Sequence, residues 1–390
     1  MKQVWLFNSL LILTVCFQGL ALGQQIPPNE ALIKPDGSGD YPTIQEGINA
    51  VADGGTVLLA DGVFSGPGNT NLVFPGTGLT LKSQNLNREN CIIDCIGDRG
   101  LERMSAFVIE DLVDGPAIIS LTVRNGSAAE GGGAYVSNSQ VAFVSVLFED
   151  NQAGSEGAAL YCENSDVFVS NCWFFANASN EHGGAIQLRG VNQETQVSNC
   201  QFENNSAGVG GGAIDIFDGP DLLVEFSVFR ANSAEGQGGA IADWDAGSTT
   251  LVYVTLAENS GHYGGAVYAA NSAQLDIEAC IVAHSLQGSA VYIDPVGGMP
   301  DATIHCTDIW GNAGGDWTWP ISEWWEGESG NIHADPQFCG ELGSWNLFLQ
   351  SDSPCAEGNN DCSLTMGMLP VNCDETLAAT TTWSRLKSSY

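Results

Sequence analysis

The chain has 390 residues, with 46 acidic against 11 basic side chains and a formal net charge of −35 at pH 7. A surface this acidic repels nucleic acids and anionic membranes, and it disfavours a polyanionic substrate unless calcium screens the charge. The 48 glycines and the 15% share of charged residues are typical of a turn-rich β protein, which excludes an intrinsically disordered chain.

Residues 1–23 are predicted to be a secretory signal peptide. Lys2 is their only charged residue, an apolar run covers residues 10–15, and small residues precede Gln24. This run is too short to span a bilayer, and no other apolar segment is long enough to cross one. We therefore expect a secreted or cell-surface protein without a membrane span.

Residues 33–60 are predicted to form an entry cap and the first buried strand. Ile44, Ile48 and Val51 have the i, i+4, i+7 spacing of one helical face. A glycine-rich turn at residues 53–55 ends this helix, and a strand follows at residues 57–59. Since the first layer of a stacked repeat cannot be left open to water, an amphipathic helix here would cover it.

A phrase of two small residues, an alanine and then an aliphatic or aromatic residue recurs between residues 131 and 290. Its alanines are Ala134, Ala159, Ala185, Ala213, Ala240, Ala266 and Ala290, at steps of 25, 26, 28, 27, 26 and 24 residues. An asparagine keeps the same period at Asn125, Asn151, Asn177, Asn205, Asn232 and Asn259, with His284 in the next slot and Asn312 after it. A repeat of about 26 residues with short strands and glycine at its corners predicts a solenoid of parallel β coils.

Stacked coils place equivalent residues in columns. The residues one and three places after the alanine are predicted to point inward: Leu160, Cys162, Ile186, Leu188, Ile214, Ile216, Val267 and Ala269. The asparagines are predicted to form a buried ladder at a turn, where each amide bonds the coils above and below.

Eleven cysteines remain after the predicted signal peptide, an odd number for an exported protein. Cys172 and Cys200 each stand five places before an asparagine, so we expect them to be stacked, buried free thiols. The last four are Cys339, Cys355, Cys362 and Cys373. A bridge between Cys355 and Cys362 and another across the rest of this cluster are both open, because sequence does not fix the connectivity.

The repeat resembles the right-handed parallel β-helix proteins of the pectin-lyase-like fold, whose coils commonly carry an aromatic residue, an asparagine and Gly-Gly-Ala-Ile. Residues 36–45 resemble the first coil of pectin methylesterases, and residues 331–338 and 351–354 resemble the last coil of many exported bacterial β-helix proteins. The repeat also resembles surface adhesins and autotransporter passengers. The resemblance implies one right-handed parallel β-helix domain over residues 24–375, with an N-terminal helical cap and a C-terminal tail at residues 376–390.

The resemblance does not extend to known catalytic motifs. The Gln-Asp pair of pectin methylesterases and the Asn-Thr-Asp, Asp-Asp and Gly-His-Gly phrases of polygalacturonase-type hydrolases are absent. The sequence also lacks a Gly-x-Ser-x-Gly elbow, a His-Glu-x-x-His motif and a phosphate-binding loop. The five histidines lack metal-ligand spacing and are interpreted as turn residues.

The residues two and four places after the alanine are predicted to form an outward face. The first set is Tyr161, Gln187, Asp215, Ala242 and Tyr268, the second is Glu163, Arg189, Phe217, Trp244 and Ala270, and Asp218 and Asp245 come one place later. Aromatic rings stack on sugars, whereas carboxylates ligate calcium or act as acid and base. This face is therefore the candidate functional site.

Three functions remain open for this face. One is binding of a polysaccharide or cell-surface glycan through Tyr161, Phe217, Trp244 and Tyr268. Another is lyase or hydrolase action on an acidic polysaccharide: in lyases of this fold a basic residue beside calcium-binding acids abstracts a proton, so the resemblance implies catalytic Arg189, Asp215, Asp218 and Asp245. The third is a passive adhesin or structural stalk with an ordinary solvated face. Calcium is the one cofactor suggested, its ligands are unknown, and we expect a monomer.

Half of the ten tryptophans lie in an interruption of the repeat: Trp310, Trp317, Trp319, Trp324 and Trp325. We favour a cap that folds over the end of the stack, because exposed tryptophans in a loop promote aggregation. The alternative is a surface that binds sugar or a partner.

Overall fold

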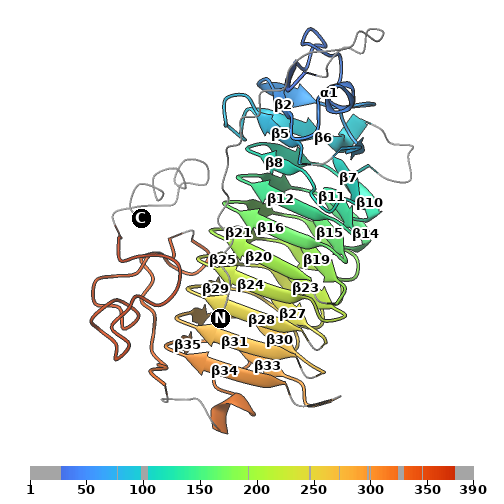
Figure 1. Ribbon diagram of the computed structural model, residues 1–390. Helices are drawn as coiled ribbons and strands as arrows, with labels where there is room; N and C mark the ends of the chain where they lie inside the picture. Colours follow the sequence, from blue (N-terminus) through green and yellow to red (C-terminus); the bar gives the residue numbers. More distant parts are fainter. Residues whose placement is uncertain are drawn as a thin grey trace, which may run out of the picture.

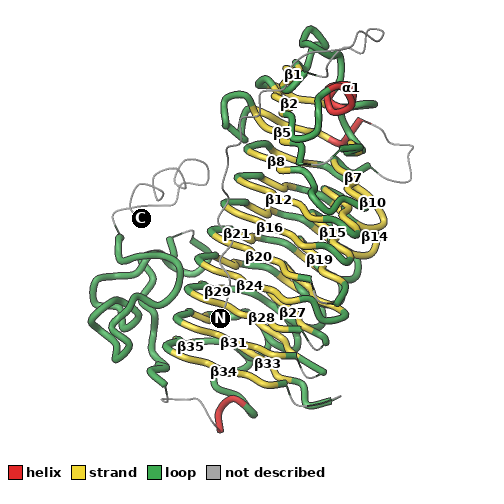
Figure 2. Tube along the Cα trace, viewed as in Figure 1, coloured by secondary structure: helices red, strands yellow, loops and turns green. Residues whose placement is uncertain are grey.

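The computed structural model describes residues 28–373 except 77, 98–103, 192, 246, 272, 297, 299, 324–328 and 345. The predicted signal peptide and C-terminal tail lie outside these residues. The described chain forms short β-strands stacked along one axis, with the helix α1 at the N-terminal end (Figure 1; Figure 2). No helix among the described residues is both long and apolar enough to cross a bilayer.

Two long sheets run along the solenoid, and all their neighbouring strands are parallel. The 11-stranded sheet consists of β1 (Glu30–Ile33), β2 (Thr56–Leu59), β5 (Thr80–Ser83), β8 (Ala117–Ile119), β12 (Gln140–Val144), β16 (Asp166–Ser170), β20 (Glu194–Ser198), β24 (Asp221–Glu225), β28 (Ser248–Val252), β31 (Gln274–Glu278) and β34 (Asp301–His305). The 10-stranded sheet consists of β3 (Gly62–Phe64), β6 (Cys91–Asp94), β9 (Thr122–Arg124), β13 (Leu147–Glu149), β17 (Trp173–Phe175), β21 (Gln201–Glu203), β25 (Val228–Arg230), β29 (Thr255–Ala257), β32 (Ile281–Ala283) and β35 (Asp308–Trp310).

Of the remaining two sheets, one also runs along the solenoid and the other spans five coils. The 9-stranded sheet consists of β4 (Leu72–Val73), β7 (Phe107–Glu110), β11 (Ala134–Ser137), β15 (Leu160–Glu163), β19 (Ile186–Arg189), β23 (Ile214–Phe217), β27 (Ile241–Asp243), β30 (Val267–Ala269) and β33 (Val291–Ile293). The 5-stranded sheet consists of β10 (Ser127–Glu130), β14 (Gln152–Glu156), β18 (Ala178–Ser179), β22 (Ser206–Ala207) and β26 (Ser233–Ala234). The predicted parallel β-helix is thereby confirmed.

The strand register confirms the period and corrects its first copy. Ile186 pairs with Ile214, and Ile214 with Ile241, so neighbouring coils are offset by 28 and 27 residues. In the first copy Ala134 pairs with Leu160, which places Gly133 rather than Ala134 opposite Ala159. The sequence phrase is misaligned there because three glycines precede the alanine, and the left-handed glycine of the turn is the first of them, Gly131.

The core lies inside the coils as predicted. All eight residues expected to point inward are buried in one cluster. A column of stacked phenylalanines runs through the same core: Phe148, Phe174, Phe202 and Phe229, with ring centroids 5.2, 4.6 and 4.5 Å apart. Each coil alone could not bury these rings, so the packing between coils stabilises the stack.

The asparagine ladder is confirmed over five coils. Asn205 donates from Nδ2 to Asn232 Oδ1 at 2.9 Å and to the Phe174 carbonyl at 2.9 Å, and its side chain is fully buried. The ladder runs through Asn151, Asn177, Asn205, Asn232 and Asn259. Two assignments at its ends are wrong: Asn125 and His284 occupy the left-handed position one residue earlier, and Gly126 and Ser285 take the ladder slots.

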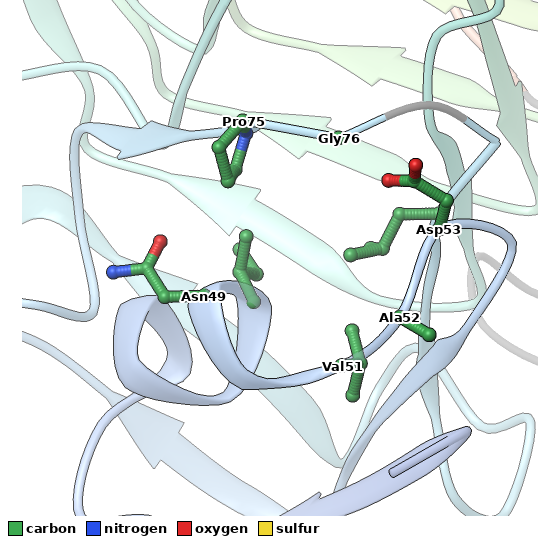
Figure 3. Close-up of a pocket in the computed structure, with 8 residues that line it drawn as sticks. Asn49, Val51, Ala52, Asp53, Pro75 and Gly76 are labelled. Atoms are coloured by element: carbon green, nitrogen blue, oxygen red, sulfur yellow. The ribbon is translucent and has the colours of Figure 1, made fainter. Parts of the chain in front are cut away.

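The N-terminal end is capped by α1 (Ile44–Ala50). Thr43 is its N-cap and accepts a hydrogen bond from the Glu46 amide, while Ile44 and Ile48 are buried against the first strands. The helix ends one residue before Val51, which is extended and packs partly on the core. A small hollow beside the helix is lined by Asn49, Asp53, Pro75 and their neighbours (Figure 3).

Part of the tryptophan segment covers the C-terminal end of the solenoid. Trp317 packs into the solenoid core, and so does Ile321, the first residue of the 3-10 helix η2 (Ile321–Glu323). The expected cap is confirmed for Trp317, whereas Trp319 is 55% exposed. Trp324 and Trp325 lie outside the described residues.

The segment of residues 338–344 and 346–373 folds back along the outer face of the 10-stranded sheet (Figure 1). We call it the strap. Disulfides join Cys306 to Cys362 and Cys339 to Cys373, so the Cys355–Cys362 bridge that the sequence left open is not formed, and the bridge across the rest of the cluster is confirmed. Cys355 is a buried free thiol, as are Cys172 and Cys200, which confirms the expectation for that stacked pair.

Candidate functional site

The candidate site is the outer face of the 9-stranded sheet, which we call the aromatic face. It has three columns of side chains that follow the coils. The centre column is Tyr135, Tyr161, Gln187, Asp215, Ala242, Tyr268 and Tyr292. The second column includes Glu163, Arg189 and Phe217, followed by Trp244. The third column is Glu130, Glu156, His182, Gly210, Gln237 and Tyr263.

The centre column is not the open surface that the sequence suggested. Tyr161, Gln187, Asp215, Ala242 and Tyr268 are all at most 5% exposed. The expectation of exposure is wrong for these residues because a column of side chains covers them on either side. The second column remains accessible: Arg189, Phe217 and Trp244 are half-buried, although Ala270 is buried.

Arg189 is held by Glu156 and not by the predicted aspartates. Its Nε lies 2.8 Å from Glu156 Oε2, and a second bond joins its terminal nitrogen to the other carboxylate oxygen. The guanidinium carbon also lies 5.2 Å from the centre of the Phe217 ring, a cation–π distance. Burial alone would lower the pKa of Arg189, but the bonds to Glu156 raise it above its ordinary value, which makes Arg189 a poor proton acceptor.

Asp215 is the buried partner of two aromatic side chains. Its Oδ1 accepts a 2.9 Å hydrogen bond from Trp244 Nε1 and lies 3.4 Å from His182 Nδ1. Burial favours neutral His182, but the Asp215 carboxylate outweighs it and raises the pKa of the imidazole. Gly210 packs over this cluster, because a Cβ there would lie 3.0 Å from both Asp215 Oδ1 and the Trp244 ring.

A row of aromatic rings extends down the face from Arg189. Phe217 and Trp244 stack at 5.4 Å with an interplanar angle of 11°, and Trp244 meets Tyr268 at 5.0 Å with a tilt of 55°. Tyr268 stacks on Tyr292 at 5.9 Å and donates its hydroxyl to Asp294. Burial, with Asp294 beside it, raises the pKa of Tyr268 and keeps its hydroxyl protonated as a donor.

Asp218 and Asp245 lie at the adjoining turn, as expected. Asp218 is exposed and has a left-handed backbone, and its amide donates to Asp245 Oδ2 at 3.3 Å. Asp245 also accepts a long bond from Asn271. Among the described residues no group of three or more acidic, histidine or cysteine side chains has a geometry that could hold a metal ion. Calcium binding therefore stays a prediction.

Sequence reasoning missed four members of the face: Glu156, His182, Tyr292 and Asp294. Glu156 and His182 precede the glycine turn; His182 was interpreted as a turn residue and Glu156 was not considered. Their bridges to the next coils show that this part of the repeat also stacks in register. An alignment of the residues just before each glycine turn would have identified this third column.

Comparisons with known proteins agree with this architecture. The repeat model of the Chlamydia polymorphic membrane protein family matches residues 145–163 and 199–216. Each matched run holds a core phenylalanine, a ladder asparagine and the small residues of the glycine turn. At the level of sequence, no curated protein matches the chain.

Three solved structures illustrate the likeness. Pectate lyase Pel9A is similar with a TM-score of 0.52 and 14% identity, over 88% of this chain and 96% of that one. A rhamnogalacturonan lyase gives a TM-score of 0.46 at 12% identity, over 92% and 98%. Pectin methylesterase PemA from Erwinia chrysanthemi gives 0.39 at 14% identity, over 82% and 98%. The likeness to Pel9A shows the fold alone, and the chain is a parallel β-helix of the pectate-lyase-like kind.

Proposed function

We propose that the protein is a secreted or cell-surface solenoid that binds a polysaccharide along the aromatic face. The observation that carries this proposal is the row Phe217, Trp244, Tyr268 and Tyr292, which is flanked by Arg189, His182 and several carboxylates. Aromatic rings provide apolar area for sugar rings, and charged or polar neighbours bond the hydroxyl groups.

The direction of the row fits a linear polymer. The rings follow the coils, so an extended glycan lying along the solenoid axis would meet one ring after another. The half-buried Phe217, Trp244 and Tyr292 are the accessible members, whereas the buried Tyr268 packs between Trp244 and Tyr292. The structural likeness to a pectate lyase, whose name denotes action on a polysaccharide, supports the same class of ligand.

A polysaccharide array, with and without calcium, tests this proposal. We expect at least one glycan to bind, and Trp244→Ala to weaken binding about tenfold, the size of one lost ring contact. Phe168→Ala is the matched control, because Phe168 is a 41% exposed aromatic residue on the 11-stranded sheet. If no glycan binds, a passive stalk is favoured. If both variants lose the same amount of affinity, the glycan binds outside the aromatic face.

The second candidate is a lyase or hydrolase that acts on an acidic polysaccharide with Arg189, Asp215, Asp218 and Asp245. The observation in its favour is that Arg189 and exposed Asp218 lie on one face close enough for their charges to interact. The bidentate pairing with Glu156 counts against Arg189 as the base. Unsaturated products on the same array would indicate a lyase, and new reducing ends without unsaturation would indicate a hydrolase; loss of either in Arg189→Lys would establish the activity. Binding without either product would exclude both activities for the glycans tested.

A further inference from the structure

Three side chains of the aromatic face meet at one buried oxygen. Asp215 Oδ1 accepts the 2.9 Å hydrogen bond from Trp244 Nε1 and lies 3.4 Å from His182 Nδ1. The Asp215 side chain has no exposed surface, whereas the His182 side chain is 15% exposed. The indole is therefore oriented from beneath by a carboxylate that no ligand reaches, and His182 links that carboxylate to the solvent.

The imidazole of His182 also packs against two accessible rings of the face. Its centroid lies 5.0 Å from that of Phe217 and 5.8 Å from that of Trp244, with interplanar angles of 89° and 81°. Perpendicular contacts of this kind are attractive between aromatic rings. Because Phe217 and Trp244 are stacked on each other, one imidazole holds the pair from the side. Gly210, the next residue of the third column, leaves room for this arrangement, since a Cβ there would lie 3.0 Å from the Trp244 ring.

Charged groups on three strands face the imidazole. Asp215 on β23 and Glu156 on β14 favour its protonated form, whereas Arg189 on β19 opposes it. Burial also opposes protonation, but the carboxylates outweigh it and raise the pKa of His182 above its ordinary value. The protonated ring has an N–H at both nitrogens and always presents one to Asp215, whereas the neutral ring has a single N–H. A hydrogen bond between two charged groups is also stronger than one from a neutral donor, so the protonated ring holds the indole partner more firmly.

We propose that His182 is a positioning residue of the aromatic face, which fixes Phe217 and Trp244 for sugar stacking when its imidazole is protonated. This inference rests on the proposed glycan binding and adds its regulation: the affinity for glycan is higher in a mildly acidic medium than in an alkaline one. His182 does not need to touch the glycan for this. It acts through the two rings that it contacts and through the carboxylate that orients one of them.

The polysaccharide array, repeated with the full chain between about pH 5 and about pH 8, tests the inference. We expect each bound glycan to lose affinity by about threefold as His182 is deprotonated, because the contacts that fix the two rings weaken. An NMR titration of the Trp244 indole N–H measures the same coupling without a glycan, since its resonance should shift with the midpoint of the His182 imidazole. Asp215→Asn should move the midpoints of the affinity profile and of the imidazole to lower pH together, which a merely structural role of His182 would not do.

His182→Gln retains an N–H donor but has no proton to titrate, so its affinity should be independent of pH and no higher than that of the parent at the alkaline end. His305→Gln is the matched control and should keep the parent's pH profile, because His305 is exposed on the 11-stranded sheet. If His182→Gln does not fold, the midpoints in Asp215→Asn still decide. A pH dependence that persists in His182→Gln, or an indole resonance that does not follow the imidazole, would overturn the inference and leave glycan binding intact. If no glycan binds at any pH, the proposed function and the affinity change both fail, even where the indole resonance follows His182.

Discussion

Each of two faces of this solenoid carries an arginine that is paired with glutamate. The two arginines differ in how much of the protein covers them. On the aromatic face the Arg189 side chain is 31% exposed, with Glu156 as its ion-pair partner and Phe217 beneath it. On the 10-stranded sheet the Arg230 side chain is 7% exposed and is held by both Glu203 and Glu258. The strap accounts for the difference, because it lies over the second face and leaves the first open.

The strap makes the covered face part of a core. Leu347, Phe348, Met368 and Leu369 pack against Val228 and other residues of the 10-stranded sheet, and the Gly343 amide donates to Glu258. A buried charge must have its partners in the protein, whereas a half-exposed one can exchange them for solvent or ligand. Similar coil-stacked side chains therefore serve stability on one face and remain accessible on the other.

The largest expected effect comes from removing the covered arginine. Arg230→Ala leaves two buried glutamates without their shared cationic partner and should lower the free energy of unfolding by about 3–5 kcal/mol. Arg189→Ala should cost about 1 kcal/mol or less, since removing a side chain that is 31% exposed opens the Glu156 carboxylate to water. Urea denaturation of both variants measures the difference.

A triple variant controls for the lost volume of Arg230. Arg230→Met with Glu203→Gln and Glu258→Gln removes all three charges together and should recover most of the loss. Equal destabilisation by Arg189→Ala and Arg230→Ala would contradict the distinction between the two faces.

The next effect concerns the attachment of the strap. Replacing both Cys339 and Cys373 by serine opens a loop between residues 34 positions apart and should lower the free energy of unfolding by about 2–4 kcal/mol. Any glycan affinity of the aromatic face should not change, because the strap lies on another sheet. Reductant should destabilise the parent more than the double variant, which retains only the Cys306–Cys362 bridge. A parallel loss of glycan binding would show that the faces are coupled.

The fold was predictable from sequence because stacking forces every coil to repeat the same local solutions. Left-handed glycine turns, inward aliphatic pairs such as Ile214 and Ile216, and ladder residues such as Asn205 recur with the period of the coil. The strap has no such period, so its cysteine pairing could not be derived. Cys362 reaches back to Cys306 on the end of a strand, a contact that no spacing rule indicates.

The site was predictable in position but not in exposure. Periodicity placed Asp215 and Tyr268 on the outward side of their sheet, and they are there. Their burial depends on neighbouring columns, including His182 before the glycine turn, and the sequence pattern does not say how closely those columns pack. The partner of Arg189 was missed for the same reason, since Glu156 belongs to a preceding strand and not to the motif itself.

A smaller effect should appear as a pH dependence of the covered face. Burial raises the pKa of Glu203 to about 8 against the pull of Arg230, with Glu258 raising it further. A raised folded-state pKa means that the stabilising contribution is complete below the ordinary pKa of 4.5 and is lost as the pH rises through about 8. The melting temperature of the parent protein should therefore fall as the pH rises over this interval.

Glu203→Gln should flatten that dependence, because the neutral side chain mimics the protonated form. Glu163→Gln is the control, since Glu163 is a half-buried carboxylate of the aromatic face. An unchanged pH profile in Glu203→Gln would show that Glu203 ionises normally beneath the strap.

The smallest effect belongs to the open face. His182 has a raised pKa because Asp215 lies beside it, while Glu156 adds to the shift and Arg189 opposes it. Its contribution to stability is therefore present below the ordinary pKa of 6.5 and is lost as the pH rises through the folded-state value. We expect less than about 1 kcal/mol, because burial of the imidazole opposes most of the gain from Asp215. An NMR titration of the imidazole should give a pKa above 6.5 in the parent and a lower one in Asp215→Asn. His262 is exposed on the same side of the solenoid and provides the internal reference in each spectrum. If Asp215→Asn does not change the midpoint of the His182 titration, the buried carboxylate has no electrostatic effect on the imidazole.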